Sequence, residues 1–217
     1  MAKIRVRYET IEFDHIDLHV RSLRDNQQFS DDDGVAESLG ISSATWPLFG
    51  IMWPSGCVLA HYMQDFDVEG KRVLEVGCGI GLTSLLLNHR HTDITATDYH
   101  PEAASFMREN TRLNQDADIP FVRTGWADAD SGLGLFDLIV GSDLLYESEH
   151  VELLAKFINQ HAKPECEVIL VDPGRGNHAR FSKRMVTLGY TQTQASPVSV
   201  DFLSAPFKGQ ILNYKRC

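Results

Sequence analysis

Residues 71–84 read KRVLEVGCGIGLTS and are the most informative stretch of the chain. An apolar run, interrupted only by Glu75, precedes three glycines at alternate positions, and a leucine-rich run follows at once. A short apolar run before a glycine-rich turn is typical of a buried parallel strand, and the leucine run predicts a helix packed on that strand. Glycines at the junction permit a sharp turn and let a ligand lie against the main chain. We therefore expect a strand–loop–helix unit that holds a nucleotide-like cofactor.

The spacing of the glycines indicates which cofactor this unit holds. A dinucleotide fingerprint, G-x-G-x-x-G, needs a glycine at position 82, where the chain has Leu82. The pattern is instead E-x-G-x-G-x-G, made by Glu75, Gly77, Gly79 and Gly81. It resembles the first motif of the seven-strand, S-adenosylmethionine-dependent methyltransferases, whose cofactor has cationic groups and no phosphate. An acidic strand residue suits the cationic amino acid end of such a cofactor. The alternative is an ordinary tight turn between a strand and a helix.

Composition restricts the classes of protein that fit. A chain of 217 residues with 43% hydrophobic content suits one domain, with room for a small appendage, and no apolar run approaches a membrane span. The start of the chain lacks the apolar segment of a signal peptide, and the four scattered cysteines favour neither a zinc site nor disulfides, so we expect a cytoplasmic protein without a metal. The net charge of −10 disfavours nucleic acid and suits a basic protein partner.

The first 44 residues are expected to form an extension of the main domain, which would span residues 45–217. Apolar and polar residues alternate in two stretches within residues 4–20, which predicts a two-stranded hairpin or edge ribbon. The polar stretch 24–34 contains three consecutive aspartates, Asp31 to Asp33. A solvated loop is the favoured interpretation over a cation site, because the glycine and glutamate spacing of a calcium loop is missing.

Residues 45–56, TWPLFGIMWPSG, combine two Trp-Pro pairs with a phenylalanine and a methionine just before a helix expected at 57–63. Proline excludes one continuous helix through this segment. Flat aromatic faces suit stacking on adenine or contact with a cation, so the segment could line the cofactor pocket. Plain core packing by Trp46 and Trp53 is an equally good interpretation.

Asp98 ends the second expected strand of the main domain, residues 93–98, and lies 21 residues beyond Gly77. In nucleotide-binding α/β folds an acid at this place accepts hydrogen bonds from the ribose hydroxyls, and a carboxylate suits a vicinal diol. The alternative is an N-cap for the helix expected at 101–114. The intervening residues Tyr99 and His100 make that alternative the weaker one.

Two further strand ends carry candidate site residues. The strand expected at 119–124 runs into Gly125-Trp126, and the strand expected at 136–140 runs into GSDLLYE at 141–147. Residues at the carboxyl ends of parallel strands border the ligand crevice. This places Trp126 near the cofactor, and Asp143 and Tyr146 where the substrate should lie. A turn capped by Asp143, with Tyr146 packing, is the alternative.

The rest of the chain continues the alternation of strands and helices. Helices are expected at 151–161 and 179–188, and strands at 166–171, 191–202 and 210–214. Arg175, in the loop DPGRG, could either reach into the crevice or face solvent. The alternation over residues 70–190 predicts a mostly parallel, doubly wound α/β sheet.

Taken together, these motifs resemble one group of methyltransferases, the seven-strand protein-lysine methyltransferases with a D-x-x-Y motif after the fourth strand. The resemblance rests on WPSG at 53–56, VLEVGCGIGLTS, TATD, the strand-end GW and FDLIVGSDLLYE, and covers residues 45–172. It implies a Rossmann-like sheet of six parallel strands and an antiparallel seventh. It also implies cofactor contacts by Trp53, Glu75, Gly77, Cys78, Gly79, Asp98, Trp126 and Ser142. Asp143 and Tyr146 would be the catalytic residues on the substrate side.

The activity implied by the resemblance is direct in-line methyl transfer from S-adenosylmethionine, which becomes S-adenosylhomocysteine. A protein lysine is the favoured acceptor, with a small-molecule N- or O-methyltransferase as the alternative and a non-catalytic cofactor-binding protein as a third possibility. Asp143 would orient the amine and Tyr146 would form a wall of its channel. We expect a monomer with no membrane partner.

Overall fold

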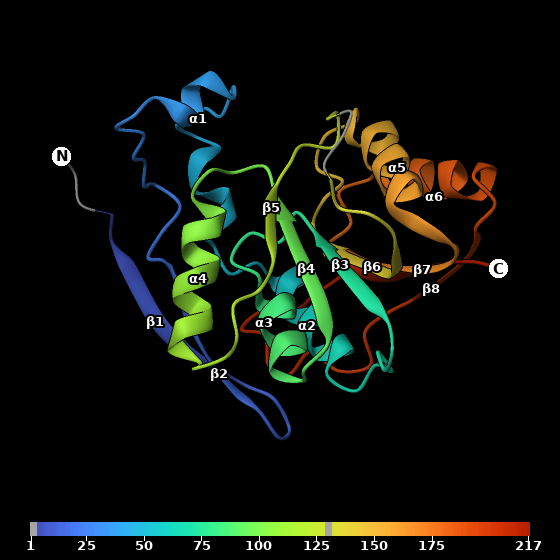
Figure 1. The fold of residues 1–217 in the computed structure, drawn as a ribbon, viewed down its shortest axis with the longest axis horizontal. Coiled ribbons are helices and arrows are strands. Elements are labelled where there is room, and N and C mark those ends of the chain that lie inside the picture. Colours follow the sequence, from blue (N-terminus) through green and yellow to red (C-terminus); the bar gives the residue numbers. More distant parts are fainter. Residues whose placement is uncertain (1–3, 129–131) are drawn as a thin grey trace.

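The computed structural model describes residues 4–128 and 132–217. Its main body is a seven-stranded sheet in the order β5-β4-β3-β6-β7-β9-β8, and a separate two-stranded sheet is formed by β1 and β2 (Figure 1). The strands are β1 (Val6–Glu12), β2 (Asp17–Leu23), β3 (Arg72–Val76), β4 (Asp93–Asp98), β5 (Phe121–Arg123), β6 (Phe136–Ser142), β7 (Ala162–Asp172), β8 (Thr191–Ala195) and β9 (Gln210–Arg216).

Strand directions in the large sheet match the expected α/β architecture. The strands β3 to β7 pair in parallel, whereas β9 pairs antiparallel with both β7 and β8, so one strand of the seven runs against the other six. From β3 the chain first builds outward to β4 and β5, and it then returns to the other side of β3 as β6. Such a reversal opens a crevice at the carboxyl ends of the two central strands. The glycine loop follows β3 and the D-x-x-Y segment follows β6, so both lie at this crevice.

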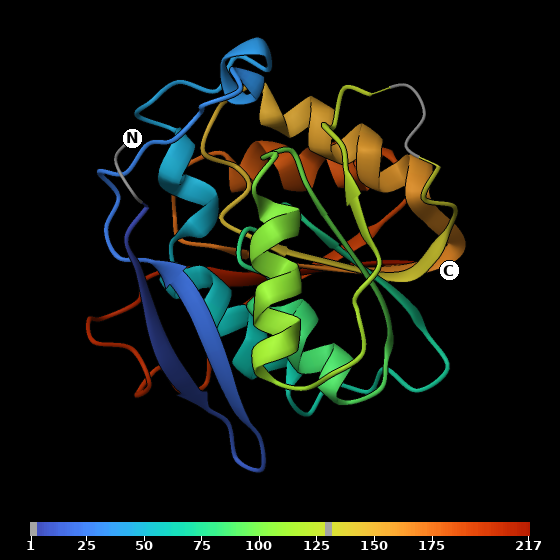
Figure 2. The ribbon, with the colours of Figure 1, turned by 60° about the vertical axis from the view of Figure 1, so that its left-hand side comes forward.

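The helices form a layer on each face of the sheet (Figures 1 and 2). Alternate residues of β3 enter different apolar clusters: Val73 packs with α2, α3 and α4, whereas Leu74 packs with α5 and α6. Burial on both faces explains why Val73, Leu74 and Val76 are all apolar. No helix in the described part of the chain is both long and apolar enough to cross a membrane. The helices are α1 (Val35–Ser38), the 3₁₀ helix η1 (Trp46–Gly50), α2 (Pro54–Met63), α3 (Leu82–His89), α4 (Ala103–Leu113), α5 (His150–His161) and α6 (His178–Thr187).

Two expected boundaries are wrong in an informative way. The helix expected to begin at Cys57 begins at Pro54, because proline is well tolerated in the first turn, where its missing N–H has no helical partner. The strand expected to reach Phe202 ends at Ala195, which is the last residue paired with β9. Pro197 cannot donate a hydrogen bond to a sheet, and residues 196–209 form a long loop instead.

The N-terminal strands form the expected antiparallel hairpin, which lies alongside α4 (Figure 2). Asn110 of α4 accepts a hydrogen bond from the Arg21 N–H at 2.7 Å and donates one to the Arg21 carbonyl at 3.2 Å. Asn114 makes the same pair of bonds with His19, at 2.8 and 2.9 Å. The side chains of Asn110 and Asn114 thus satisfy backbone N–H and C=O groups of β2 that a further strand would otherwise pair with. The division at residue 44 stays a prediction.

The carboxylate of Asp31, the first of the three consecutive aspartates, is hydrogen-bonded within the chain. Both carboxylate oxygens of Asp31 accept backbone N–H groups, from Ala36 and Glu37, at 2.8 Å each. The carboxylate therefore satisfies N–H groups at the start of α1 that have no helical partner. Within residues 4–128 and 132–217, no group of three or more acidic, histidine or cysteine side chains could hold a metal ion.

Candidate functional site

The glycine loop after β3 has a backbone that other residues adopt only with strain. Gly77, Gly79 and Gly81 have φ values of 60°, 57° and 76°. A Cβ atom on Gly79 would lie 2.8 Å from the carbonyl oxygen of Phe49, so η1 packs directly against the loop. Positive φ and this close contact together require glycine here.

Asp98 fastens the glycine loop to the end of β4. One carboxylate oxygen accepts the N–H of Gly79 and the other accepts the N–H of His100, both at 2.8 Å. Each oxygen keeps a second lone pair, so the carboxylate can still accept two hydroxyl groups. Burial raises the pKa of Asp98, and the backbone hydrogen bonds oppose that rise. The helix α4 has Glu102 at its N-cap, so the capping alternative for Asp98 is wrong. Ribose binding stays a prediction.

Glu75 is directed at the N-terminus of α3. Its buried carboxylate accepts the backbone N–H of Ser84 at 2.8 Å and also a short hydrogen bond from the Ser84 hydroxyl. Gly81, at the N-cap position, has no side chain to perform this task, and a negative charge is favourable at a helix N-terminus. Burial raises the pKa of Glu75 to about 7, against the opposing hydrogen bonds from Ser84. A contact between Glu75 and the cofactor stays a prediction.

The raised pKa of Glu75 should make stability depend on pH. An unfolded carboxyl ionises near 4.5, whereas Glu75 in the fold ionises near 7. Between these values the folded chain holds a proton that the unfolded chain has lost, so the free energy of unfolding falls as the pH rises. In wild type, Glu75 should lower the free energy of unfolding by about 3 kcal/mol between pH 5 and pH 8. We expect this decrease to be absent in Glu75→Gln. Urea unfolding at both pH values measures it, with the exposed Glu149→Gln as the control. Equal pH dependence in Glu75→Gln and wild type would contradict this account.

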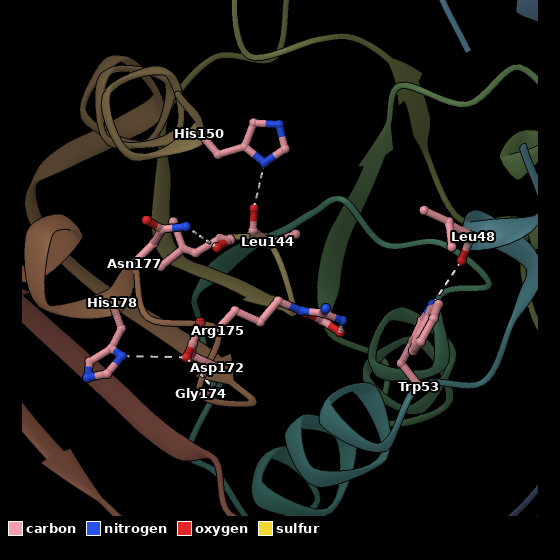
Figure 3. A network of polar contacts seen from close by, with 11 residues as sticks. Leu48, Trp53, Leu144, His150, Asp172, Gly174, Arg175, Asn177 and His178 are labelled. Atoms are coloured by element: carbon pink, nitrogen blue, oxygen red, sulfur yellow. Dashed lines mark hydrogen bonds and ion pairs between the residues drawn. The ribbon is translucent and has the colours of Figure 1, made fainter. Parts of the chain in front are cut away.

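An aromatic row connects the glycine loop to the D-x-x-Y segment. The ring of His150 makes edge contacts with Trp126, at 5.0 Å between centroids, and with Tyr146, at 4.5 Å. Its Nδ1 lies 3.0 Å from the carbonyl oxygen of Leu144, a contact visible in Figure 3. Trp126 in turn lies beside Gly77, 3.7 Å from the place a Cβ would occupy. The fold therefore brings together the glycine loop, Trp126 and Tyr146.

Asp143, at the end of β6, is paired with Arg175. The Nε and Nη2 atoms of Arg175 donate to the two carboxylate oxygens of Asp143 at 2.5 and 2.8 Å. The Asp143 side chain is 11% exposed and the Arg175 side chain 43%. The backbone of Asp143 has a φ of 55°, which aspartate tolerates better than most residues. Of the two interpretations open for Arg175, the structure supports the one in which it reaches the crevice.

A cleft of about 400 Å³ opens beside this ion pair. Trp53 lies in its wall, and the indole N–H of Trp53 donates to the Leu48 carbonyl at 2.9 Å (Figure 3). Trp46, in contrast, is 1% exposed and packs edge-on against Phe49. Core packing is therefore the correct interpretation for Trp46, and pocket lining is the correct one for Trp53. The cleft is lined by Trp53, Pro54, Ser55, Asp143, Pro173, Arg175, Leu203, Ser204, Ala205, Pro206, Phe207 and Lys208.

The remaining site candidates lie nearby. Ser142 ends β6, and its hydroxyl oxygen lies 3.6 Å from where a Cβ of Gly56 would be, at the first turn of α2. Cys78 sits inside the glycine loop, and burial raises the pKa of its thiol well above the ordinary value, so the group is neutral. The fold thus gathers the candidate residues along one edge of the sheet.

Three contacts of this site were not expected from the sequence. These are the Asp143–Arg175 pair, the placement of His150 between Trp126 and Tyr146, and a hydrogen bond at 2.9 Å from the side chain of Asn177 to the Leu145 carbonyl. Only Arg175 had a signal in the sequence, because it follows the end of a strand in a glycine-flanked loop. His150 and Asn177 look like ordinary residues at helix starts.

Comparison with known proteins gives consistent matches. A family model described as lysine methyltransferase matches residues 40–186. The electron transfer flavoprotein beta subunit lysine methyltransferase of Xenopus laevis is 30% identical over 144 residues, which is 64% of this chain and 56% of that protein. The calmodulin-lysine N-methyltransferase of Arabidopsis thaliana is 28% identical over 150 residues, covering 63% and 49%. A histone-arginine methyltransferase of Xenopus laevis, METTL23, is 29% identical over 126 residues, covering 54% and 53%.

The solved structures that match share the fold. A methyltransferase from Pyrococcus furiosus superposes with a TM-score of 0.59 at 20% identity, over 74% of this chain and 83% of that one. This chain spans about half the length of the curated relatives it matches.

Proposed function

The chain belongs to the lysine methyltransferase family, and from this premise we propose that it transfers a methyl group from S-adenosylmethionine to a lysine side chain of a protein. One observation supports the proposal most strongly: the glycine loop and Asp98 meet the D-x-x-Y segment at the reversal point of the sheet. Ligands of open α/β sheets bind at such a point. A cofactor bound there would present its reactive group to Asp143 and Tyr146.

The residues present fit S-adenosylmethionine. Asp98 is held by two backbone N–H groups and has free lone pairs for the ribose hydroxyls. Trp126 offers an apolar face beside Gly77. The carboxylate of Asp98 also offers a negative charge to a cofactor that carries a sulfonium and an ammonium group, and opposite charges attract strongly in a partly buried site. We assign cofactor binding to Trp53, Glu75, Gly77, Cys78, Gly79, Asp98, Trp126 and Ser142.

The reaction needs an acceptor amine with a free lone pair. When bound, the sulfonium supplies an activated methyl carbon and a thioether leaving group that takes the bonding electron pair. Neutralising a lysine with a pKa of about 10.4 costs roughly 4.6 kcal/mol at pH 7. Desolvation in the cleft favours the neutral amine. Asp143 accepts a hydrogen bond from that amine and aims its lone pair, and Tyr146 forms a wall. The gain comes mostly from proximity and alignment.

We expect the protein to label one or a few proteins in an extract of its source cells. Purified protein is incubated with the extract and methyl-labelled S-adenosylmethionine, and the products are separated into protein and small-molecule fractions. Amino acid analysis of labelled protein should give methyllysine. Methylarginine would instead show that the acceptor is an arginine side chain. Asp143 can hydrogen-bond a guanidinium, as its pair with Arg175 shows. Label confined to the small-molecule fraction would contradict a protein acceptor.

A further inference from the structure

Asp143 and Arg175 form a side-on pair with two hydrogen bonds between the same two groups. Paired bonds of this kind between an arginine and a carboxylate are stronger and more directional than a single contact between charged groups. The carboxylate is 11% exposed and the guanidinium 43%, so water screens the pair from the side of Arg175 while the Asp143 end is largely shielded. The pair is therefore a built feature of the crevice and not a loose surface contact.

The loop that carries Arg175 is attached to the D-x-x-Y segment on both sides of that residue. Before it, the Asp143 N–H donates to the Val171 carbonyl at 2.9 Å, and Asp172 accepts the Gly174 N–H at 2.8 Å. After it, the side chain of Asn177 donates to the Leu145 carbonyl at 2.9 Å. The backbone around Arg175 is thereby held against the segment that contains Asp143.

Asp143 and Arg175 also line the same cleft, together with Trp53. An amine that enters the cleft and reaches the carboxylate of Asp143 therefore meets the guanidinium as well. A lone carboxylate beside an amine favours its ammonium form, which has no lone pair and cannot accept a methyl group. A carboxylate already paired with a guanidinium has little net charge and lacks this effect.

We propose that Arg175 keeps Asp143 in a charge-neutral pair while the acceptor is bound, so that the cleft holds the acceptor amine as the neutral nucleophile. Arg175 is then a positioning residue that acts through Asp143. The inference rests on the proposed function, because it concerns the amine that receives the methyl group. Before transfer, the acceptor ammonium loses one proton to solvent. The amine lone pair then forms the N–CH₃ bond while the C–S bond breaks.

Other charged and titratable groups face this pair. Asp172 at the end of β7 and Tyr146 after β6 act on Arg175, and Glu147 and Asp98 act on Tyr146. His150 and His178 lie at the starts of α5 and α6, and Lys208 lines the cleft from the loop between β8 and β9. Without Arg175, the negative charges of Asp143 in the cleft wall and of Asp172, which acts on Arg175, would no longer be balanced by the guanidinium. Loss of Arg175 should therefore favour a bound ammonium.

Calorimetry with n-butylamine, a free equivalent of the lysine side chain, tests the proposal without methyl transfer. The amine is titrated at pH 8 into protein saturated with S-adenosylhomocysteine, in buffers of different ionisation enthalpy, which gives the number of protons released on binding. Wild type should release close to one proton per amine. Arg175→Gln should release clearly fewer and bind at least about 10-fold more tightly, since a neighbouring opposite charge changes an amine pKa by one to three units.

Two variants separate charge from structure. Arg175→Lys restores the positive charge and should recover most of the proton release. Arg184→Gln removes an arginine of similar exposure on α6, which pairs with Glu152 at 2.9 Å, and should behave as wild type. Where transfer is measured, the acidic limb of the pH profile should move upward by about one unit in Arg175→Gln and not in Arg175→Lys.

Several outcomes would overturn the inference. Wild type that releases no proton holds the amine as ammonium, and equal proton release by wild type and Arg175→Gln means that Arg175 does not influence the amine. Absence of any heat with butylamine would mean that the cleft is not an amine site. Failure of the proposed function is recognised separately, because it shows as absent S-adenosylhomocysteine binding or as label outside the protein fraction.

Discussion

Asp143→Asn should lower kcat/KM for methyl transfer at least about 100-fold and leave the affinity for S-adenosylmethionine within about twofold. The carboxylate is expected to aim the acceptor amine, and Asp143 directly follows β6 and lines the cleft. Asparagine has nearly the same size and tolerates the φ of 55° at this position, so the backbone should persist. The change removes the negative charge and the ion pair with Arg175 and retains the fold.

A matched control exists on the same strand. Asp137, near the start of β6, is paired with Lys163 at 2.7 Å and accepts the Arg72 N–H at 2.9 Å. Asp137→Asn should transfer methyl groups as wild type does, because it lies at the opposite edge of the sheet from the crevice. Calorimetry with S-adenosylmethionine and initial rates of transfer measure both variants. Loss of cofactor binding together with transfer in Asp143→Asn would mean that Asp143 belongs to the cofactor site.

Asp98→Ala should weaken S-adenosylhomocysteine binding by about 10-fold to 100-fold and also destabilise the fold. The loss of affinity reflects the missing acceptors for the ribose hydroxyls. Leaving a buried polar group without its hydrogen-bond partner costs about 1–3 kcal/mol of binding free energy. The loss of stability arises because the N–H groups of Gly79 and His100 lose their acceptor. We expect the free energy of unfolding to fall by about 1–3 kcal/mol as well.

Asp93→Ala is the control for this change, because Asp93 starts the same strand and makes an exposed ion pair with Arg72 at 3.3 Å. Exposed pairs contribute little, so both affinity and stability should stay close to wild type. Calorimetry with S-adenosylhomocysteine and urea unfolding separate the two effects. Unchanged affinity in a destabilised Asp98→Ala would reduce Asp98 to a structural residue of the glycine loop.

The elements of this fold follow from patterns within short stretches of sequence. Apolar and polar alternation predicts the N-terminal hairpin, and the apolar run before Gly77 predicts the buried strand β3. Leucines after Gly81 predict α3. These predictions are confirmed because hydrophobic period and glycine conformation act over a few neighbouring residues. The loop after Ala195 was missed because the end of β8 depends on where β9 stops pairing with it.

The sequence by itself determined the family, the α/β architecture and the edge of the sheet at which the candidate residues gather. It did so because parallel strands that alternate with helices place all their carboxyl ends on one side. It also placed Asp98, Asp143 and Tyr146 at strand ends, although their roles stay predictions.

Tertiary structure alone decided the partners of those side chains. Arg175 lies 32 residues from Asp143, and they meet because β6 and β7 are neighbours in the sheet. Glu75 lies at the end of a strand like Asp98, yet its carboxylate is directed to the N-terminus of α3. Trp46 and Trp53 have the same local Trp-Pro sequence, yet Trp46 starts η1 and is buried, whereas Trp53 is the extended N-cap of α2 and lines the cleft. Burial and charge pairing are set by residues distant in the chain, so no local pattern records them.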